Sequence, residues 1–122
     1  MKPGKTGFTR VAHAFGYSLQ GINAAWKHEA SFRQEIWMAA VLLPLAVWLA
    51  TSHIELILLV ASVFWVIIAE LINSSVEAVV DRTGSEVHEL SGRAKDIGSA
   101  VVLFSLILLA LVWGIIACHR FF

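Results

Sequence analysis

Hydrophobic and polar residues follow one another along this chain in four blocks. From Phe8 to Trp26, large apolar residues recur at alternating steps of three and four, the spacing of one face of an α-helix. Three uncharged runs follow, at residues 36–52, 56–69 and 97–118. The last is 22 residues long. As a helix it would measure about 33 Å, enough to cross a hydrocarbon core of about 30 Å.

The other two runs are shorter. The run 36–52 has 17 residues, near the lower limit for a span, and the run 56–69 has 14. The second becomes long enough only if its helix continues through Glu70 toward Val80. We therefore predict a single all-α membrane domain over residues 1–122. Its expected parts are a tail at 1–6, a surface helix at about 7–30, and transmembrane helices at about 33–52, 54–81 and 91–118.

Polar residues cover the remainder of the helix predicted at 7–30. Because no soluble core lies beside it, we expect this amphipathic helix to lie in the membrane interface. Composition agrees with a membrane protein, since 58% of the residues are hydrophobic and only 15% are charged. A soluble domain has about 45–50% apolar and about 25% charged residues. Zero net charge gives no reason to expect nucleic-acid binding, and the single cysteine excludes a disulfide framework.

Lysine and arginine are distributed unequally around the predicted spans. Five precede the first span, three lie between the second and third, and one follows the third. By the positive-inside rule, the N-terminus and the 81–96 connection face the cytoplasm, and the C-terminus lies outside. The first 35 residues are polar and interrupted by charges, so we expect no cleavable signal peptide.

A polar stripe follows the second predicted span. Glu70, Asn73, Glu77 and Asp81 are three, four and four residues apart. They form what we call the acidic stripe, because the last three lie at about −60°, −20° and +20° from Glu70 around a helix. A carboxylate after fourteen apolar residues is expensive to place in lipid. Glu70 must therefore face protein, water or a metal.

Two chemistries fit such a stripe: proton or cation transport, and a Mg²⁺ site with a catalytic base. The third predicted span begins near Arg93 and Lys95, with Ser91 as a possible cap, and a basic helix N-terminus binds phosphate. Glu29 and Glu35 lie at the entrance of the first span. Acids for Mg²⁺ beside bases for phosphate favour nucleotide chemistry at a membrane surface.

Two segments carry a family resemblance. Residues 70–82 read Glu-Leu-Ile-Asn-Ser-Ser-Val-Glu-Ala-Val-Val-Asp-Arg, and residues 88–96 read His-Glu-Leu-Ser-Gly-Arg-Ala-Lys-Asp. Both closely resemble the bacterial integral-membrane diacylglycerol kinases, as do residues 7–10, 24–26, 29–30 and 32–35. The resemblance covers nearly the whole chain. It departs from the family at Val87, where an aromatic is usual, and at Ser75, where alanine is usual.

The resemblance implies a homotrimeric lipid kinase with composite active sites between protomers in the bacterial inner membrane. It would transfer the γ-phosphate of MgATP to 1,2-diacylglycerol and give phosphatidic acid, within phospholipid metabolism. It also implies Glu70 as proton acceptor with Asn73 beside it, and Glu29 and Glu77 as metal ligands. The implied ATP contacts are Arg10, Tyr17, Glu29, Glu77, Glu86, His88, Lys95 and Asp96. The implied lipid contacts are Arg10, Glu70 and Ser99, and Glu35 and Asp81 are further functional positions.

Three alternatives remain at this point. Some family members phosphorylate undecaprenol, although residues 89–93 look more like the Gram-negative diacylglycerol enzymes. A small multidrug or cation transporter would use Glu70 to bind its cargo and would drive proton flux without ATP. A non-catalytic membrane subunit would leave the whole set of polar residues unexplained.

Overall fold

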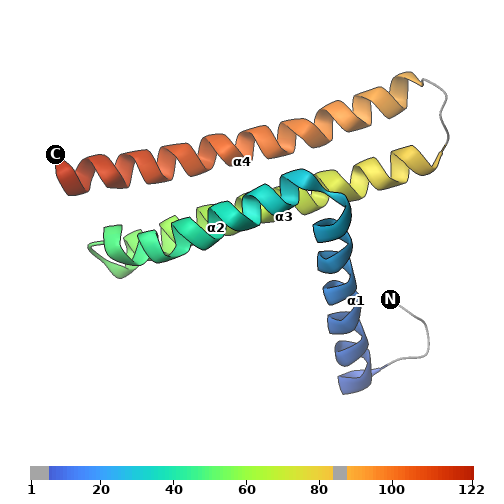
Figure 1. Cartoon of the computed structure of the whole chain (residues 1–122), viewed down its shortest axis with the longest axis horizontal. Coiled ribbons are helices and arrows are strands. Elements are labelled where there is room, and N and C mark those ends of the chain that lie inside the picture. Colours follow the sequence, from blue (N-terminus) through green and yellow to red (C-terminus); the bar gives the residue numbers. More distant parts are fainter. Residues whose placement is uncertain (1–5, 84–87) are drawn as a thin grey trace.

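The computed structural model describes residues 6–83 and 88–122, which form four α-helices (Figure 1). Three of these helices are long and apolar enough to cross a membrane. The prediction of an N-terminal helix followed by three helices of membrane-spanning length is therefore confirmed. Their bounds are Gly7–His28 for α1, Ala30–Leu49 for α2, His53–Arg82 for α3 and Glu89–Phe121 for α4.

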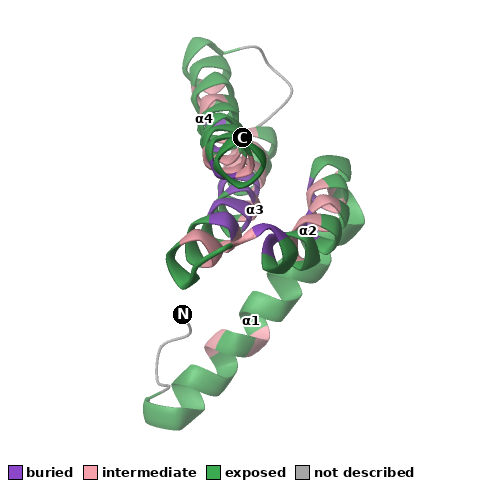
Figure 2. Cartoon of the chain, turned by 90° about the vertical axis from the view of Figure 1, so that its left-hand side faces the viewer, coloured by how far each residue is buried: buried purple, intermediate pink, exposed green. Residues whose placement is uncertain are grey.

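The three long apolar helices lie lengthwise beside one another, and α1 stands out sideways from the start of α2 (Figure 1). The end-on view in Figure 2 places α3 between α4 and α2. The most extensive packing joins α3 to α4, and the next joins α2 to α3. The helix that carries the acidic stripe is therefore the central one, with a neighbour on either side.

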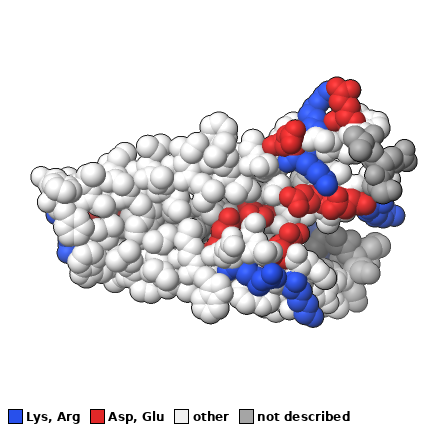
Figure 3. All heavy atoms as spheres, turned by 45° about the horizontal axis from the view of Figure 1, so that its top comes forward, with Lys and Arg blue, Asp and Glu red and all other residues white. Residues whose placement is uncertain are grey.

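The helices differ in length. With 20 residues, α2 is about 30 Å long, which matches a hydrocarbon core. The other two have 30 and 33 residues, so they measure about 45 and 50 Å. Both are long enough to extend past the core, and charged side chains gather at the end where α3 and α4 are connected (Figure 3).

A single residue, Glu29, separates α1 from α2. Its backbone is extended, with φ −119° and ψ 106°. The guanidinium of Arg33 reaches back and donates to the carbonyl oxygens of Trp26 (2.6 Å) and Lys27 (3.3 Å). These bonds satisfy carbonyls that a helix end leaves free. The break is therefore sharper than the expected gap between a helix ending near residue 30 and a span beginning near 33.

The fourth helix also begins earlier than expected. Its N-cap is His88, whose Nδ1 accepts a hydrogen bond from the backbone N–H of Leu90 at 3.0 Å. The cap considered from the sequence, Ser91, lies inside the helix instead. At its other end α4 continues to Phe121, beyond the predicted limit at residue 118.

A cluster of buried apolar residues lies near the α2–α3 turn. A hydrogen bond also joins α4 to α3: the Trp113 indole Nε1 of α4 donates to the Ser62 hydroxyl of α3 at 3.1 Å. Buried small residues such as Ala39 and Ala69 allow close helix packing. The apolar residues at the centre of this cluster are Ala46, Leu49, Leu59 and Ile116.

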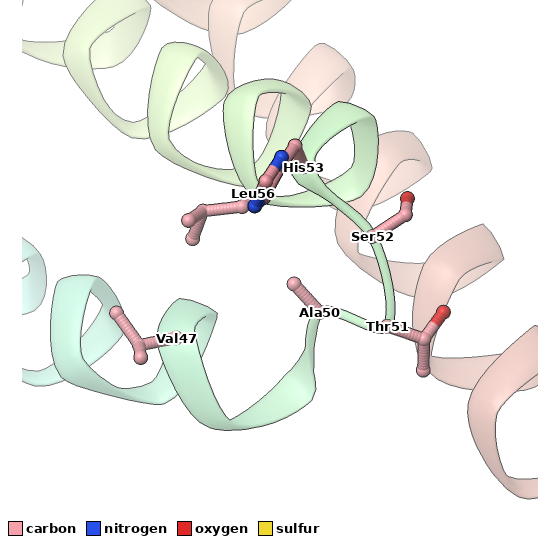
Figure 4. Close-up of a pocket in the computed structure, with 6 residues that line it drawn as sticks. All are labelled: Val47, Ala50, Thr51, Ser52, His53 and Leu56. Atoms are coloured by element: carbon pink, nitrogen blue, oxygen red, sulfur yellow. The ribbon is translucent and has the colours of Figure 1, made fainter.

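The C-terminal end of α4 is tied to the same turn. Arg120 donates to the Leu49 carbonyl oxygen at 3.4 Å, and its guanidinium carbon lies 5.3 Å from the centre of the Trp48 ring. Glu55 and His119 lie 3.5 Å apart at this end. A pocket opens beside the turn, without any carboxylate in its described lining (Figure 4). It is lined by Val47, Ala50, Thr51, Ser52, His53 and Leu56.

Candidate functional site

Burial decreases along the acidic stripe toward the connected ends of α3 and α4. Glu70 is 5% exposed, Asn73 and Glu77 are half-buried, and Asp81 is exposed. The deepest of the three acids is therefore enclosed by protein even in a single chain. This satisfies the requirement that a carboxylate at this position should not face lipid.

Two neighbours contact the Glu70 carboxylate. The Ser74 hydroxyl donates to Glu70 Oε2 at 3.3 Å, one turn along the same helix. From α2, the carboxyl group of Glu35 lies close enough to Glu70 for the two charges to interact. Glu35 Oε2 is buried and has no hydrogen-bond partner among the described residues. Since two carboxylates in contact repel each other, this α2–α3 interface suits a proton or a cation between them.

The outer part of the stripe is organised by Asn73. Its Nδ2 donates to Glu77 Oε1 at 3.0 Å, so the amide fixes the direction of that carboxylate. Asn73 Oδ1 is also buried and lacks a partner within the described ranges. The resemblance implies Asn73 beside Glu70, the expected proton acceptor; in the structure the Asn73 side chain donates to the next carboxylate outward, Glu77.

A further acid near Glu70 is Glu29, which lies at the break between α1 and α2. It lies close enough to Glu70 for their charges to interact, as does Glu77. Carboxylate and amide oxygens are the ligands that Mg²⁺ prefers. Among the described residues no three acidic, histidine or cysteine side chains converge to hold a metal by themselves. That arrangement still fits Mg²⁺, which proteins usually bind through one or two carboxylates together with substrate phosphates and water.

A basic side chain lies at the outer end of the stripe. Lys95 of α4 forms a 2.7 Å ion pair with Asp81 of α3, and their side chains are 46% and 64% exposed. The pair joins the two helices and holds the ammonium group beside the acids. Asp96 and Ser99 follow on α4 and are also exposed. These are the proposed phosphate and lipid contacts that α4 provides.

Two of the remaining predicted ATP contacts, Arg10 and Tyr17, do not join this group within one chain. Arg10 and Tyr17 are exposed on α1, the helix that stands apart from α4 (Figures 1 and 2). His88 serves as the cap of α4, which occupies its Nδ1 and leaves only Nε2 for another partner. Glu86 lies outside the described residues.

A groove of about 600 Å³ runs between α1 and α3 beside the acids. Its lining is mostly apolar, for example Ile22, Ala25 and Leu71, whereas Glu29 and Ser74 give it a polar edge. The groove therefore offers apolar space directly next to two residues of the candidate site.

Two residues of the site were not identified from the sequence. Ser74 is one turn from Glu70, so its spacing could have suggested the hydrogen bond that it donates. Gly98 of α4 is buried against Asn73. Nothing in the sequence marks this glycine, because the contact depends on how α3 and α4 pack.

Comparison with known proteins supports the resemblance noted in residues 70–82 and 88–96. The model of the family described as prokaryotic diacylglycerol kinase matches residues 16–117. A diacylglycerol kinase of Escherichia coli is 51% identical over 116 residues, which cover 95% of each chain.

Two further relatives give the same result. A diacylglycerol kinase of Haemophilus influenzae is 50% identical, with 89% of this chain and 92% of the relative covered. One of Pseudomonas aeruginosa is 43% identical, with 93% and 92% covered. The match to each of these relatives thus covers about nine tenths of the chain or more. The chain belongs to the prokaryotic diacylglycerol kinase family.

Proposed function

We propose that this protein is a lipid kinase that transfers the γ-phosphate of MgATP to the hydroxyl of 1,2-diacylglycerol. The products are ADP and phosphatidic acid. The observation that carries the proposal is the buried Glu70 carboxylate, which accepts a hydrogen bond from Ser74 and lies close enough to Glu35, Glu29 and Glu77 for their charges to interact. The names of the relatives, all diacylglycerol kinases, support the choice of acceptor.

Glu70 is the group best placed to take the proton of the lipid hydroxyl. As the hydroxyl oxygen attacks the γ-phosphorus, its proton passes to the Glu70 carboxylate and the bond from phosphorus to the bridging oxygen of ADP breaks. Glu77 lies two turns further out along α3, about 10 Å away. We therefore propose that the deeper acid, Glu70, contacts the lipid hydroxyl and that the outer acid, Glu77, lies at the nucleotide.

Glu29 and Glu77 would hold Mg²⁺, with Asn73 orienting Glu77 through its 3.0 Å hydrogen bond. When bound, Mg²⁺ neutralises charge on the transferred phosphoryl group. Lys95 would donate to a phosphate oxygen, exchanging its ion pair with Asp81 for that contact. Asp96, His88 and Glu86 are proposed for the nucleoside side of ATP.

Arg10 and Tyr17 are proposed to reach ATP from another copy of the chain. Their separation from α4 within one chain supports a homotrimer with composite sites. The exposed apolar face of α1, which includes Phe8 at 92% and Phe15 at 65% exposure, supports a position in the membrane interface. Together with the lysine and arginine distribution, this supports an inner-membrane protein with its N-terminus in the cytoplasm and its C-terminus in the periplasm.

We propose that the lipid acceptor binds in the groove between α1 and α3. Its apolar lining suits acyl chains, and Glu29 and Ser74 lie at its edge, which supports a position for the glycerol hydroxyl near Glu70. Ser99 is proposed as a further lipid contact from α4.

The proposal is tested by phosphate transfer from labelled ATP in detergent micelles, with diacylglycerol and undecaprenol offered in parallel and Mg²⁺ present or absent. We expect labelled phosphatidic acid only with Mg²⁺. If a folded preparation labels undecaprenol alone, the acceptor is undecaprenol and not diacylglycerol. If it labels neither lipid, the proposal is overturned.

The base is tested by Glu70→Gln, with Glu55→Gln at the opposite end of the same helix as the matched control. Loss of a general base lowers kcat by about 10²–10⁴-fold, and we expect that loss for Glu70→Gln alone. If Glu70→Gln turns over as fast as Glu55→Gln, Glu70 is not the base.

A further inference from the structure

One glycine of α4 lies directly against the candidate site. Gly98 is buried where α4 packs on α3. A Cβ built on Gly98 would lie 2.5 Å from Asn73 Oδ1, 3.6 Å from Asn73 Cγ and 3.8 Å from Asn73 Cα. The last distance is ordinary contact, but the first is shorter than real Cβ atoms make. Any side chain at Gly98 would therefore displace the carboxamide of Asn73 and leave the backbone of α3 in place.

The glycine is needed for space and not for backbone conformation. Its φ is not positive, and the positive φ among the described residues belongs to Gly7. A Cβ built on Gly114, in the same helix, would meet nothing within 4 Å in the described part of the chain. Since glycine is a weaker helix former than alanine, a glycine at position 98 is explained by the close approach of Asn73.

The displaced group is the one that orients Glu77. Asn73 Nδ2 donates to Glu77 Oε1, while Asn73 Oδ1, at the other end of the same planar amide, rests on Gly98. Because the amide is rigid, the position of Oδ1 sets the direction of Nδ2. Contact with α4 at one end thus determines the hydrogen bond to a proposed metal ligand at the other.

We propose that Gly98 is a positioning residue, a seat on α4 that holds the Asn73 carboxamide in the orientation that directs Glu77. Its action on turnover rests on the proposed function, through the role given there to Glu77. The seat itself is a property of the α3–α4 packing, so it can be measured without substrate.

The seat is tested first by NMR without nucleotide or Mg²⁺. The chain has two asparagines, Asn23 and Asn73, so a sample labelled with ¹⁵N in the asparagine side chains gives two amide pairs. We expect Gly98→Ala to shift the Asn73 pair and leave the Asn23 pair in place, and Gly114→Ala to shift neither. An unmoved Asn73 pair in folded Gly98→Ala would overturn the proposal, whatever the kinase activity.

The consequence is tested by kinetics. Groups that orient a metal ligand change activity or metal affinity by about 10–100-fold when removed. We expect Gly98→Ala to lower kcat and raise the Mg²⁺ concentration for half-maximal activity within that range, while Gly114→Ala stays at wild type. Thermal stability should match that of Gly114→Ala. If the Asn73 pair shifts but the Mg²⁺ dependence does not, the positioning role is refuted.

The double variant Gly98→Ala/Asn73→Ala separates positioning from general damage. If Gly98 acts through Asn73, adding Gly98→Ala to Asn73→Ala should cause little further loss of activity. Additive losses would contradict this. Should Gly98→Ala fail to fold, the same double variant removes the clashing carboxamide. Recovery of folding then supports the seat, and no recovery overturns it.

Discussion

The hydrogen bond between Ser62 and Trp113 connects α3 to α4 within the apolar part of the molecule, and Ser62→Ala tests what it contributes. The Ser62 hydroxyl donates to the Leu59 carbonyl at 2.8 Å and accepts from Trp113 Nε1 at 3.1 Å. Ser62 is 3% exposed, so removing its oxygen leaves the indole N–H without this partner. Interhelical bonds in membrane proteins contribute about 0.6 kcal/mol on average and about 1.7 kcal/mol at most.

The matched control is Ser105→Ala in α4. Ser105 is 1% exposed, and its hydroxyl makes the same type of bond within its helix, to the Val102 carbonyl at 2.6 Å. Among the described residues it has no partner on another helix. Subtracting the two changes therefore isolates the bond to Trp113, and we expect Ser62→Ala to be more destabilising by about 0.6–1.7 kcal/mol.

The measurement is reversible unfolding in mixed detergent, followed by circular dichroism so that no tryptophan serves as both probe and target. A cycle with Trp113→Phe should return the same coupling energy. Equal destabilisation by Ser62→Ala and Ser105→Ala would refute the reasoning, because the interhelical bond would then contribute nothing beyond the bond within the helix.

Three further predictions concern the ends of the helices. Asp81→Asn removes the ion pair that Lys95 must give up to bind a phosphate oxygen. Since both side chains are substantially exposed, the pair is weak, so we expect KM for ATP to fall by no more than about fivefold with kcat retained; a lost kcat would give Asp81 a direct role. Arg33→Ala frees the carbonyls at the end of α1, so Glu29 should lose its fixed position and the Mg²⁺ requirement should rise; an unchanged Mg²⁺ titration would contradict this. Arg120→Ala removes the contacts to α2, so it should lower the free energy of unfolding by about 0.5–1 kcal/mol with activity intact. If the variant is as stable as the wild type in the same unfolding assay, those contacts contribute nothing.

Most of the helical framework follows from the sequence. Apolar runs and helical periodicity are local properties, and a membrane leaves a backbone few choices other than helices. The grouping of Glu70, Asn73 and Glu77 on one face could be predicted for the same reason, since it needs only 3.6 residues per turn. The depth of Glu70 followed from its place after an apolar run.

The remainder depends on contacts between helices that spacing does not determine. The break at Glu29 is stabilised by Arg33 reaching back to carbonyls of α1, which no local signal announced. The pairing of Glu35 with Glu70 needs the α2–α3 packing, and the contact of Gly98 with Asn73 needs the register of α3 on α4.

These contacts divide the acidic stripe between two neighbouring helices. Glu70 faces Glu35 on α2, whereas Asn73, which directs Glu77, rests on Gly98 of α4. Because α3 lies between α2 and α4, the proposed base and the proposed metal ligand are held by different interfaces. A small shift of α4 along α3 would therefore disturb Glu77 before it disturbed Glu70. The Ser62–Trp113 bond opposes such a shift, so its effect should extend to the Mg²⁺ requirement, which depends on Glu77, and leave proton acceptance by Glu70 unchanged.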